Sequence, residues 1–253
     1  MADLVAAPAK LDIGEVVRVT FGVIQRNLAS FLILSTIFAG VPSLVVGFGR
    51  FSIDGGQQTG PTGAFLTLFA SLVSIATNAV LQGALIHLTA GDLNGRKGSV
   101  ADGLATGLRN FLPLVGLGIL YGVGVGLGML LLIVPGFILL VMWSVAGPAL
   151  IVERKGVTES FTRSGVLTKG SRWTIFGLIV IYFVVAVVIQ MALTALVGGL
   201  SAFTEGGPGA VLATTVISIL TSMIGAAGGA VLYTELRRIR DGVGVSELAA
   251  IFD

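Results

Sequence analysis

The sequence predicts an all-α, polytopic membrane protein with six transmembrane helices and three amphipathic interfacial helices. Its 253 residues are 55% hydrophobic and only 11% charged, whereas a soluble domain averages roughly 25% charged residues. The run 111–152 contains no Asp, Glu, Lys or Arg and is about twice the ~20 residues that cross the hydrocarbon of a bilayer as a helix. We therefore expect a single membrane domain over residues 1–253.

Long uncharged runs define the six candidate spans. They cover residues 28–49, 63–91, 111–134, 136–152, 173–200 and 207–234. The longest run is divided at Pro135-Gly136, because proline stops a helix and glycine permits a tight reversal. Water must satisfy the backbone groups that such a turn frees, so we expect this turn at the far interface of the membrane. Pro148 lies late in the span that follows.

The positions of the cations predict the orientation of the chain. Of the 15 Lys and Arg residues, only Arg50 falls in a connection on the outer side of the six spans. Lys and Arg collect in cytoplasmic loops, so both termini are expected in the cytoplasm.

Three segments on the cytoplasmic side share a pattern before the first, third and fifth spans. Each has an acidic residue near its start (Glu15, Asp102 or Glu159), then a short amphipathic stretch, and then a polar break. Such stretches lie as helices in the membrane interface. The pattern divides the chain into possible repeats at 11–91, 99–152 and 157–236. The alternative is that the segments are unrelated amphipathic pieces next to spans.

Glycines recur every four residues in the third span, at Gly118, Gly122 and Gly126. Small residues at this spacing let helix backbones approach closely in membranes. Packing within one chain is the favoured interpretation of this stripe. A homo-oligomer interface and a bendable helix are the alternatives.

The chain lacks the residues that most catalytic and transport mechanisms use. It has no cysteine and one histidine, and it shows none of the common nucleotide, hydrolase or zinc motifs. The span interiors contain no Asp, Glu, Lys or Arg, which counts against a proton-driven transporter. Asn78, Gln82 and Gln190 could line a polar path, although such residues more often tie helices together. We expect no catalytic residue, cofactor, metal or nucleic-acid partner.

A distinctive pattern runs from the proposed turn into the fifth span. Its residues are Pro135-Gly136, Pro148, Glu153, Lys155-Gly156, Ser160, Arg163-Ser164, Leu167-Thr168-Lys169-Gly170 and Trp173. This pattern resembles a broad bacterial family of six-span inner-membrane proteins. The family includes the YciC-like proteins and the membrane domain attached to some glycerophosphodiester phosphodiesterases. The resemblance implies an all-helical protein of the bacterial inner (cytoplasmic) membrane. It does not imply phosphodiesterase activity, because the chain has no phosphodiesterase barrel.

Part of this pattern is a candidate site for anionic lipid headgroups. The candidate residues are Arg163, Ser164, Thr168, Lys169, Arg172 and Trp173. Each cation at phosphate depth contributes about 1 kcal/mol to binding an anionic surface. The alternative is ordinary anchoring of the topology by cations. Glu153 is expected to pair with Arg163 or to cap the interfacial helix.

These observations favour a non-enzymatic protein that engages the cytoplasmic leaflet and organises lipids, most plausibly anionic ones, or a membrane complex. A transporter or channel for a small or lipidic solute is one alternative. An accessory subunit of a larger membrane complex is another, so a membrane-protein partner or a second copy of the chain stays open.

Overall fold

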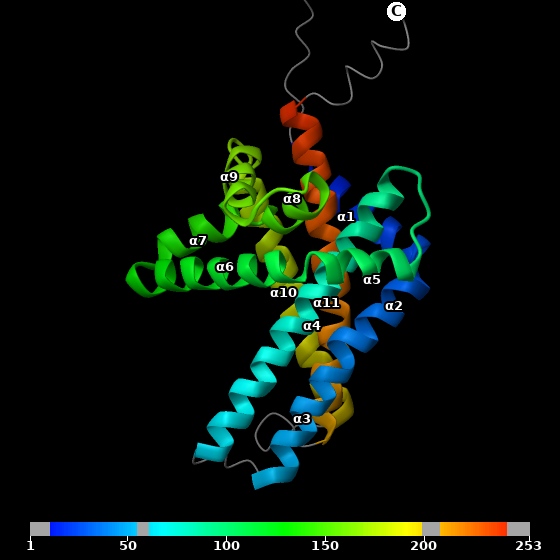
Figure 1. Ribbon diagram of the computed structural model, residues 1–253, viewed down its shortest axis with the longest axis vertical. Coiled ribbons are helices and arrows are strands. Elements are labelled where there is room, and N and C mark those ends of the chain that lie inside the picture. Colours follow the sequence, from blue (N-terminus) through cyan, green and yellow to red (C-terminus); the bar gives the residue numbers. More distant parts are fainter. Residues whose placement is uncertain (1–10, 55–60, 199–207, 242–253) are drawn as a thin grey trace, which may run out of the picture.

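The computed structural model describes residues 11–54, 61–198 and 208–241 (Figure 1). Within these ranges the chain is helical with short turns and no strand. The elements are α1 (Ile13–Arg26), α2 (Leu28–Ser35), the π-helix η1 (Thr36–Gly40), α3 (Val41–Asp54), α4 (Pro61–Leu93), α5 (Val100–Arg109), α6 (Phe111–Leu131), α7 (Ile133–Met142), α8 (Ala146–Glu153), α9 (Val157–Leu167), α10 (Arg172–Gly198) and α11 (Pro208–Asp241).

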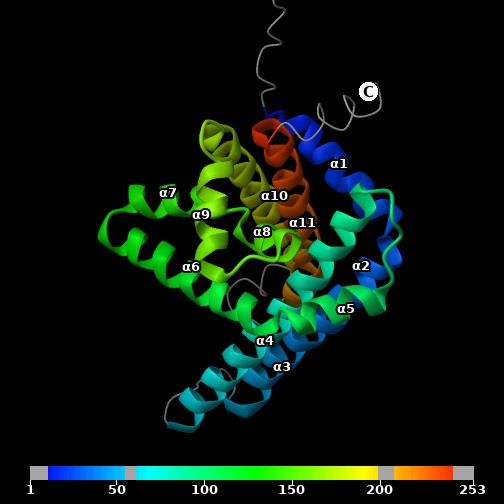
Figure 2. The same ribbon diagram turned by 45° about the horizontal axis from the view of Figure 1, so that its top comes forward.

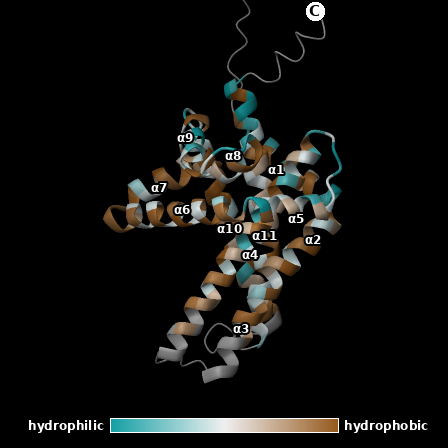
Figure 3. Ribbon diagram, viewed as in Figure 1, coloured by the Kyte–Doolittle hydropathy of each residue, from teal (hydrophilic) through white to brown (hydrophobic). Residues whose placement is uncertain are grey.

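Six helical stretches in the described part of the chain are long and apolar enough to cross a membrane. They are Leu28–Phe48, Leu68–Leu93, Phe111–Leu131, Ile133–Glu153, Arg172–Leu196 and Pro208–Asp241. Large apolar side chains such as Phe65, Leu120 and Val184 are exposed on their outer faces, as expected for surfaces that contact acyl chains. Figure 3 shows hydrophilic residues gathered at the C-terminal end of α11 and in the α4–α5 connection. The all-α, multi-pass membrane architecture is confirmed.

The helix α11 is the centre of the bundle. It packs against α1, α3, α4 and α10, and small residues such as Ala226, Ala227 and Ala230 are buried along it. Small side chains bring neighbouring helices close, which provides the dispersion contacts that hold helices together in lipid. Leu81 and Leu85 of α4 complete this core.

The first apolar stretch is interrupted by the π-helix η1. Pro42 follows this segment and has no N–H to donate to the carbonyl four residues earlier. At the junction, the N–H of Val41 donates instead to the carbonyl of Thr36, five residues back. A single wide turn of this kind accommodates the proline without ending the span.

The turn between α6 and α7 differs from the prediction. The break falls at Leu132, which is extended (φ −157°, ψ 127°), whereas Pro135 and Gly136 lie in the first turn of α7. Proline fits there because the first N–H groups of a helix have no intrahelical partner. Gly136 permits close contact, since a Cβ on Gly128 of α6 would lie 2.9 Å from the Cα of Gly136. Proline and glycine therefore close the hairpin but do not form its tip.

Packing of the predicted glycine stripe within the chain is not what the structure shows. A Cβ added at Gly118, Gly122 or Gly126 would meet no atom within 4 Å. The α6 glycines with the tightest contacts are Gly128 and Gly124, the latter against the ring of Trp143. They lie on the opposite side of α6, because residues two apart on a helix point in different directions.

The three amphipathic helices predicted from the sequence are α1, α5 and α9, and they lie in the upper half of the molecule in Figure 1. We call this half the amphipathic end. Each helix has a side-chain cap: Asp12 accepts from the N–H of Gly14 (2.7 Å), Ser99 and Asp102 form a capping box, and Glu159 accepts from the N–H of Gly156 (3.3 Å). These caps satisfy backbone donors that the helix itself leaves free.

The junctions after α1 and α5 are alike. Asn27 and Asn110 have similar backbone angles (φ −116°, ψ 21° and φ −99°, ψ 15°). Each side chain donates to the carbonyl four residues earlier, at 3.0 Å and 2.9 Å. The junction after α9 is different and uses a turn with Gly170 at φ 95°. The threefold repeat itself stays a prediction.

Candidate functional site

A network of ion pairs joins α8, α9 and α11 at the amphipathic end. The Nε of Arg163 donates to Glu153 at 2.8 Å, which confirms the predicted pair. The guanidinium also pairs with Asp241 at the end of α11. The hydroxyl of Tyr233 donates to Glu153 at 2.7 Å. One arginine thus connects three helices that are distant in sequence.

Arg163 is committed to this network. Its side chain is only 19% exposed, and the hydrogen bond to Asp241, followed by the contacts with Glu153, raises the pKa of its guanidinium. It is therefore a permanent cation whose charge is already balanced by two carboxylates. This leaves it less able than a free arginine to attract a headgroup.

Ser164 and Thr168 are buried and face the protein, not the surface. The hydroxyl of Ser164 donates to the carbonyl of Met142 (2.8 Å) and accepts from the N–H of Val145 (3.3 Å). The hydroxyl of Thr168 donates to the carbonyl of Ser164 (2.9 Å). Because the chain leaves helical geometry between α7 and α8, its backbone groups need such partners. Both side chains stabilise the α7–α8 break.

The remaining residues of the predicted cluster are exposed. Lys169 precedes the turn at Gly170, and Arg172 and Trp173 begin α10. Trp173 is 86% exposed and lies at right angles to the ring of Phe176, with ring centroids 6.2 Å apart. The structure therefore divides the predicted headgroup site into an inward part and an exposed part. Its binding to lipid stays a prediction.

Pro148 lies near the start of α8, at its third residue, and is buried. As in α7, the missing proline N–H falls where the helix has no use for it.

The three polar residues considered for a solute path are not assembled into one. Asn78 donates to the carbonyl of Ser74 on its own helix at 3.0 Å. Gln190 donates to the hydroxyl of Thr194, also on its own helix, at 3.0 Å. Gln82 is half-buried on α4. None of the three lines the cavity described next.

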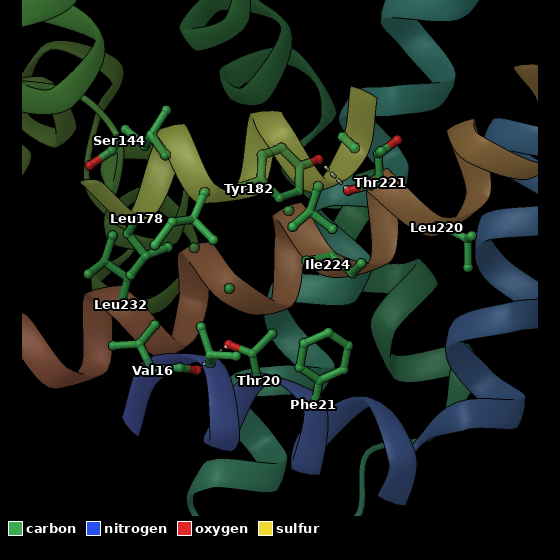
Figure 4. Close-up of a pocket in the computed structure, with 18 of the residues that line it drawn as sticks. Val16, Thr20, Phe21, Ser144, Leu178, Tyr182, Leu220, Thr221, Ile224 and Leu232 are labelled. Atoms are coloured by element: carbon green, nitrogen blue, oxygen red, sulfur yellow. Dashed lines mark hydrogen bonds between the residues drawn. The ribbon is translucent and has the colours of Figure 1, made fainter. Parts of the chain in front are cut away.

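An apolar cavity of about 480 Å³ lies between α1, α10 and α11, with α6 and α7 at its edge (Figure 4). We call it the α10 cavity. Sites for small molecules have volumes of about 300–1,000 Å³. Leucine, isoleucine and valine make most of its wall, while Gly225, Gly228 and Gly229 of α11 leave the space free of side chains.

The α10 cavity has the depth of one leaflet. Its lining on α10 runs from Leu178 to Ile189, a rise of about 16 Å at ~1.5 Å per residue. The hydrocarbon of a bilayer is about 30 Å thick. Val16 and Val17 of α1 also line the cavity, and α1 approaches α10 next to Leu178, since a Cβ on Gly177 would lie 3.7 Å from the Cδ1 of Ile13. This end of the cavity lies at the amphipathic end. The cavity therefore extends from the level of an amphipathic helix toward the middle of the membrane.

Three of the five hydroxyls in the cavity wall are satisfied by the protein. Those of Thr20 and Thr221 donate to carbonyls of their own helices (each 2.7 Å), and that of Tyr182 donates to the carbonyl of Thr221 (2.9 Å). The hydroxyls of Ser144, which is buried, and of Tyr121 have no hydrogen-bond partner among the described residues. In Figure 4, Ser144 lies on the same side of the view as Leu178. The cavity thus offers two unused hydrogen-bonding groups, and that of Ser144 lies between α7 and α8 at the amphipathic end.

Sequence reasoning missed this cavity. Its signal in the sequence is the run of small residues on α11 that faces long aliphatic residues on α10. Without the position of the neighbouring helix, such a run cannot be distinguished from a stripe of small residues that packs against another helix.

Groups of three or more His, Asp or Glu side chains that could hold a metal ion are absent from the described ranges. Comparison of the chain with protein-family models, curated proteins and solved structures gives no match.

Proposed function

We propose that this protein is a non-enzymatic, multi-pass membrane protein that binds a lipid of the cytoplasmic leaflet, with one acyl chain in the α10 cavity. The observation that supports this proposal is the cavity itself, which is apolar and as deep as one leaflet. Ser144 lies at the end of the cavity where the ester groups of a bound lipid would be. A hydroxyl there can donate to a carbonyl oxygen of the ligand.

The exposed part of the predicted cluster supports a preference for anionic lipids. Arg172 and Trp173 begin α10 within two turns of Leu178, at the top of the cavity wall. Cations and aromatic residues at this depth favour contact with phosphates and the membrane interface. Lys169 adds a third exposed side chain beside them.

The cellular setting is part of this proposal. The cation distribution favours cytoplasmic termini, and the resemblance to YciC-like proteins and related membrane domains favours a bacterial inner membrane. Transport of a small polar solute has less support, because no charged residue lines the cavity. A role as an accessory subunit has one observation in its favour: α10 is the least buried of the six apolar stretches, so a partner helix could cover it.

Filling the cavity is expected to displace the lipid. Gly228→Leu places a side chain into open space, since the nearest atom to an added Cβ is 3.9 Å away. Displacing a few methylenes at about 0.8 kcal/mol each predicts at least a tenfold loss of affinity. Native mass spectrometry of protein in mild detergent measures the phospholipid retained per chain. Gly122→Leu on the open face of α6 is the matched control and should retain lipid normally. Equal retention by both variants would refute the proposal.

Removing the hydroxyl of Ser144 is expected to lower lipid binding without lowering the stability of the protein. Ser144→Ala deletes a group that has no partner among the described residues, so the melting temperature of the lipid-free protein should stay the same or rise. Loss of one hydrogen bond of about 1 kcal/mol to the ligand should lower phospholipid retention several-fold. Undiminished retention would remove Ser144 from the site.

A further inference from the structure

The α6–α7 hairpin lies across the bundle and not along it. In Figure 1, α10 and α11 run up the picture, whereas α6 and α7 run across it and point away from the bundle. After the 45° turn in Figure 2, the hairpin still projects sideways from α11. Since α11 is one of the longest apolar helices and α4 and α10 pack along it, the bundle axis defines the direction across the membrane. A hairpin at this steep angle lies within the membrane plane.

Both ends of the hairpin are attached at the amphipathic end. The amphipathic helix α5 leads directly into α6, and α7 continues through α8 to α9. In Figure 1 the hairpin stays far above the lower ends of α3 and α4. Tyr121, in the middle of α6, contacts Trp143 at the end of α7, with ring centroids 6.3 Å apart, and Trp143 also contacts Phe161 of α9, with centroids 4.5 Å apart and the rings tilted by 51°. Aromatic residues of this kind prefer the membrane interface.

The tip of the hairpin has no polar side chain. Residues 130–134 are Leu-Leu-Leu-Ile-Val, and their exposed fractions lie between 66% and 81%. The whole stretch 122–142 contains no charged, hydroxyl or amide side chain. By contrast, the other two connections predicted on the outer side, residues 50–62 and 201–205, contain Asp54, Gln57 and Glu205. A tip that reached the outer surface would expose its apolar residues to water, whereas a tip in hydrocarbon would not.

The turn at the tip is short. Leu132 alone lies between the two helices, and its N–H donates to the carbonyl of Gly128 at 3.2 Å. Pro135 contributes no N–H to the start of α7. The other first N–H groups of α7 and the last carbonyls of α6 have no partner within their own helices, and α7 begins without a side-chain cap. Unpaired backbone is costly in lipid, so burial of the apolar side chains of the tip has to offset this cost.

We infer that α6–α7 is a re-entrant hairpin that inserts into the leaflet next to the amphipathic end, with its tip, residues 130–134, among acyl chains. The surface it presents is complementary to lipid tails and not to an aqueous phase. The other four apolar stretches cross the membrane. Because a hairpin enters and leaves on one side, both termini still lie on the same side of the membrane. A hairpin in one leaflet adds volume to that leaflet alone. The protein would therefore favour membranes in which that leaflet is on the convex side.

Single cysteines test this placement, because the chain has no cysteine of its own. Leu132→Cys is compared with Gln57→Cys in a predicted outer connection and Lys97→Cys in the α4–α5 connection. A membrane-impermeant maleimide is applied to intact cells and to inverted vesicles. We expect Gln57→Cys to react only in cells and Lys97→Cys only in inverted vesicles. Leu132→Cys should react in neither until the membrane is dissolved in SDS.

A positive readout accompanies this loss of labelling. A bimane fluorophore on Leu132→Cys, reconstituted with phosphatidylcholine brominated along the acyl chain, should be quenched, and aqueous iodide should not quench it. Val134→Cys repeats the measurement if the first variant does not fold. Labelling of position 132 from the same side as position 57 would overturn the inference.

These outcomes are separate from the proposed lipid site. If the two control positions exchange sides, the proposed orientation fails while position 132 still decides the hairpin. Retention of phospholipid by the α10 cavity does not depend on the result.

Discussion

Gly107→Ala is expected to be one of the most destabilising single substitutions in the chain. A Cβ at this position would lie 2.3 Å from the carbonyl oxygen of Val80 on α4. Backbone atoms cannot move aside as a flexible side chain can. Gly83 of α4 faces the same point, since its own Cβ would lie 2.8 Å from the Cα of Gly107. Relief of the clash therefore requires α5 to move away from α4, at a cost of about 1–3 kcal/mol or more.

The control uses the same chemical change at an open position. Gly122→Ala meets no atom within 4 Å and removes the flexibility of a helical glycine, so it should be neutral or stabilise by up to ~1 kcal/mol. Thermal unfolding in detergent, followed by tryptophan fluorescence, compares the two variants with the parent. A melting temperature for Gly107→Ala equal to that of Gly122→Ala would contradict the tight α4–α5 contact.

Arg163→Gln should have an effect of similar size for an electrostatic reason. The substitution removes the cation that Glu153 and Asp241 share and leaves only the longer contacts of Glu153 with Lys155 (3.3 Å) and of Asp241 with Arg237 (3.7 Å). Removing one partner from a buried ion pair costs about 3–5 kcal/mol. The side chains of Arg163 and Glu153 are still 19% and 13% exposed, so we expect about 2–3 kcal/mol. Loss of this cation should loosen the ends of α8 and α11 from α9.

An exposed pair provides the matched control. Arg18 pairs with Glu15 at 2.6 Å, but its side chain is 76% exposed, and pairs in water contribute little to stability. Arg18→Gln should therefore change the unfolding temperature little. A double-mutant cycle with Glu153→Gln measures the coupling to Arg163 directly. Additive effects of Arg163→Gln and Glu153→Gln would show that the network does not act as a unit.

The structure gives a physical meaning to the sequence pattern that runs from Pro135 to Trp173. Arg163 connects three helices, while the hydroxyls of Ser164 and Thr168 donate to the carbonyl of Met142 at the α7–α8 break (2.8 Å and 3.4 Å). Pro148 lies in the first turn of α8, where a missing N–H costs little. These residues build the fold at one end of the molecule.

Local chemistry accounts for what could be predicted from the residues alone. The transfer of apolar side chains out of water depends on composition along one segment, so the six apolar stretches were predictable within a few residues. The spacing of apolar residues predicted the amphipathic helices α1, α5 and α9, because this spacing is also a property of a single segment. The pair between Glu153 and Arg163 was also predictable, because both residues lie near one short connection.

Relations between distant segments depended on the packed structure. Whether Gly107 or Gly122 meets a neighbour is decided by where α4 lies, and the glycine itself carries no mark of it. The break at Leu132 depends on how α6 and α7 pack, although Pro135 suggested a later position. The α10 cavity exists because small residues of α11 face long ones of α10 without filling the gap. Hydropathy is a property of one helix, whereas clefts, contacts and the angle of a hairpin are properties of helix pairs.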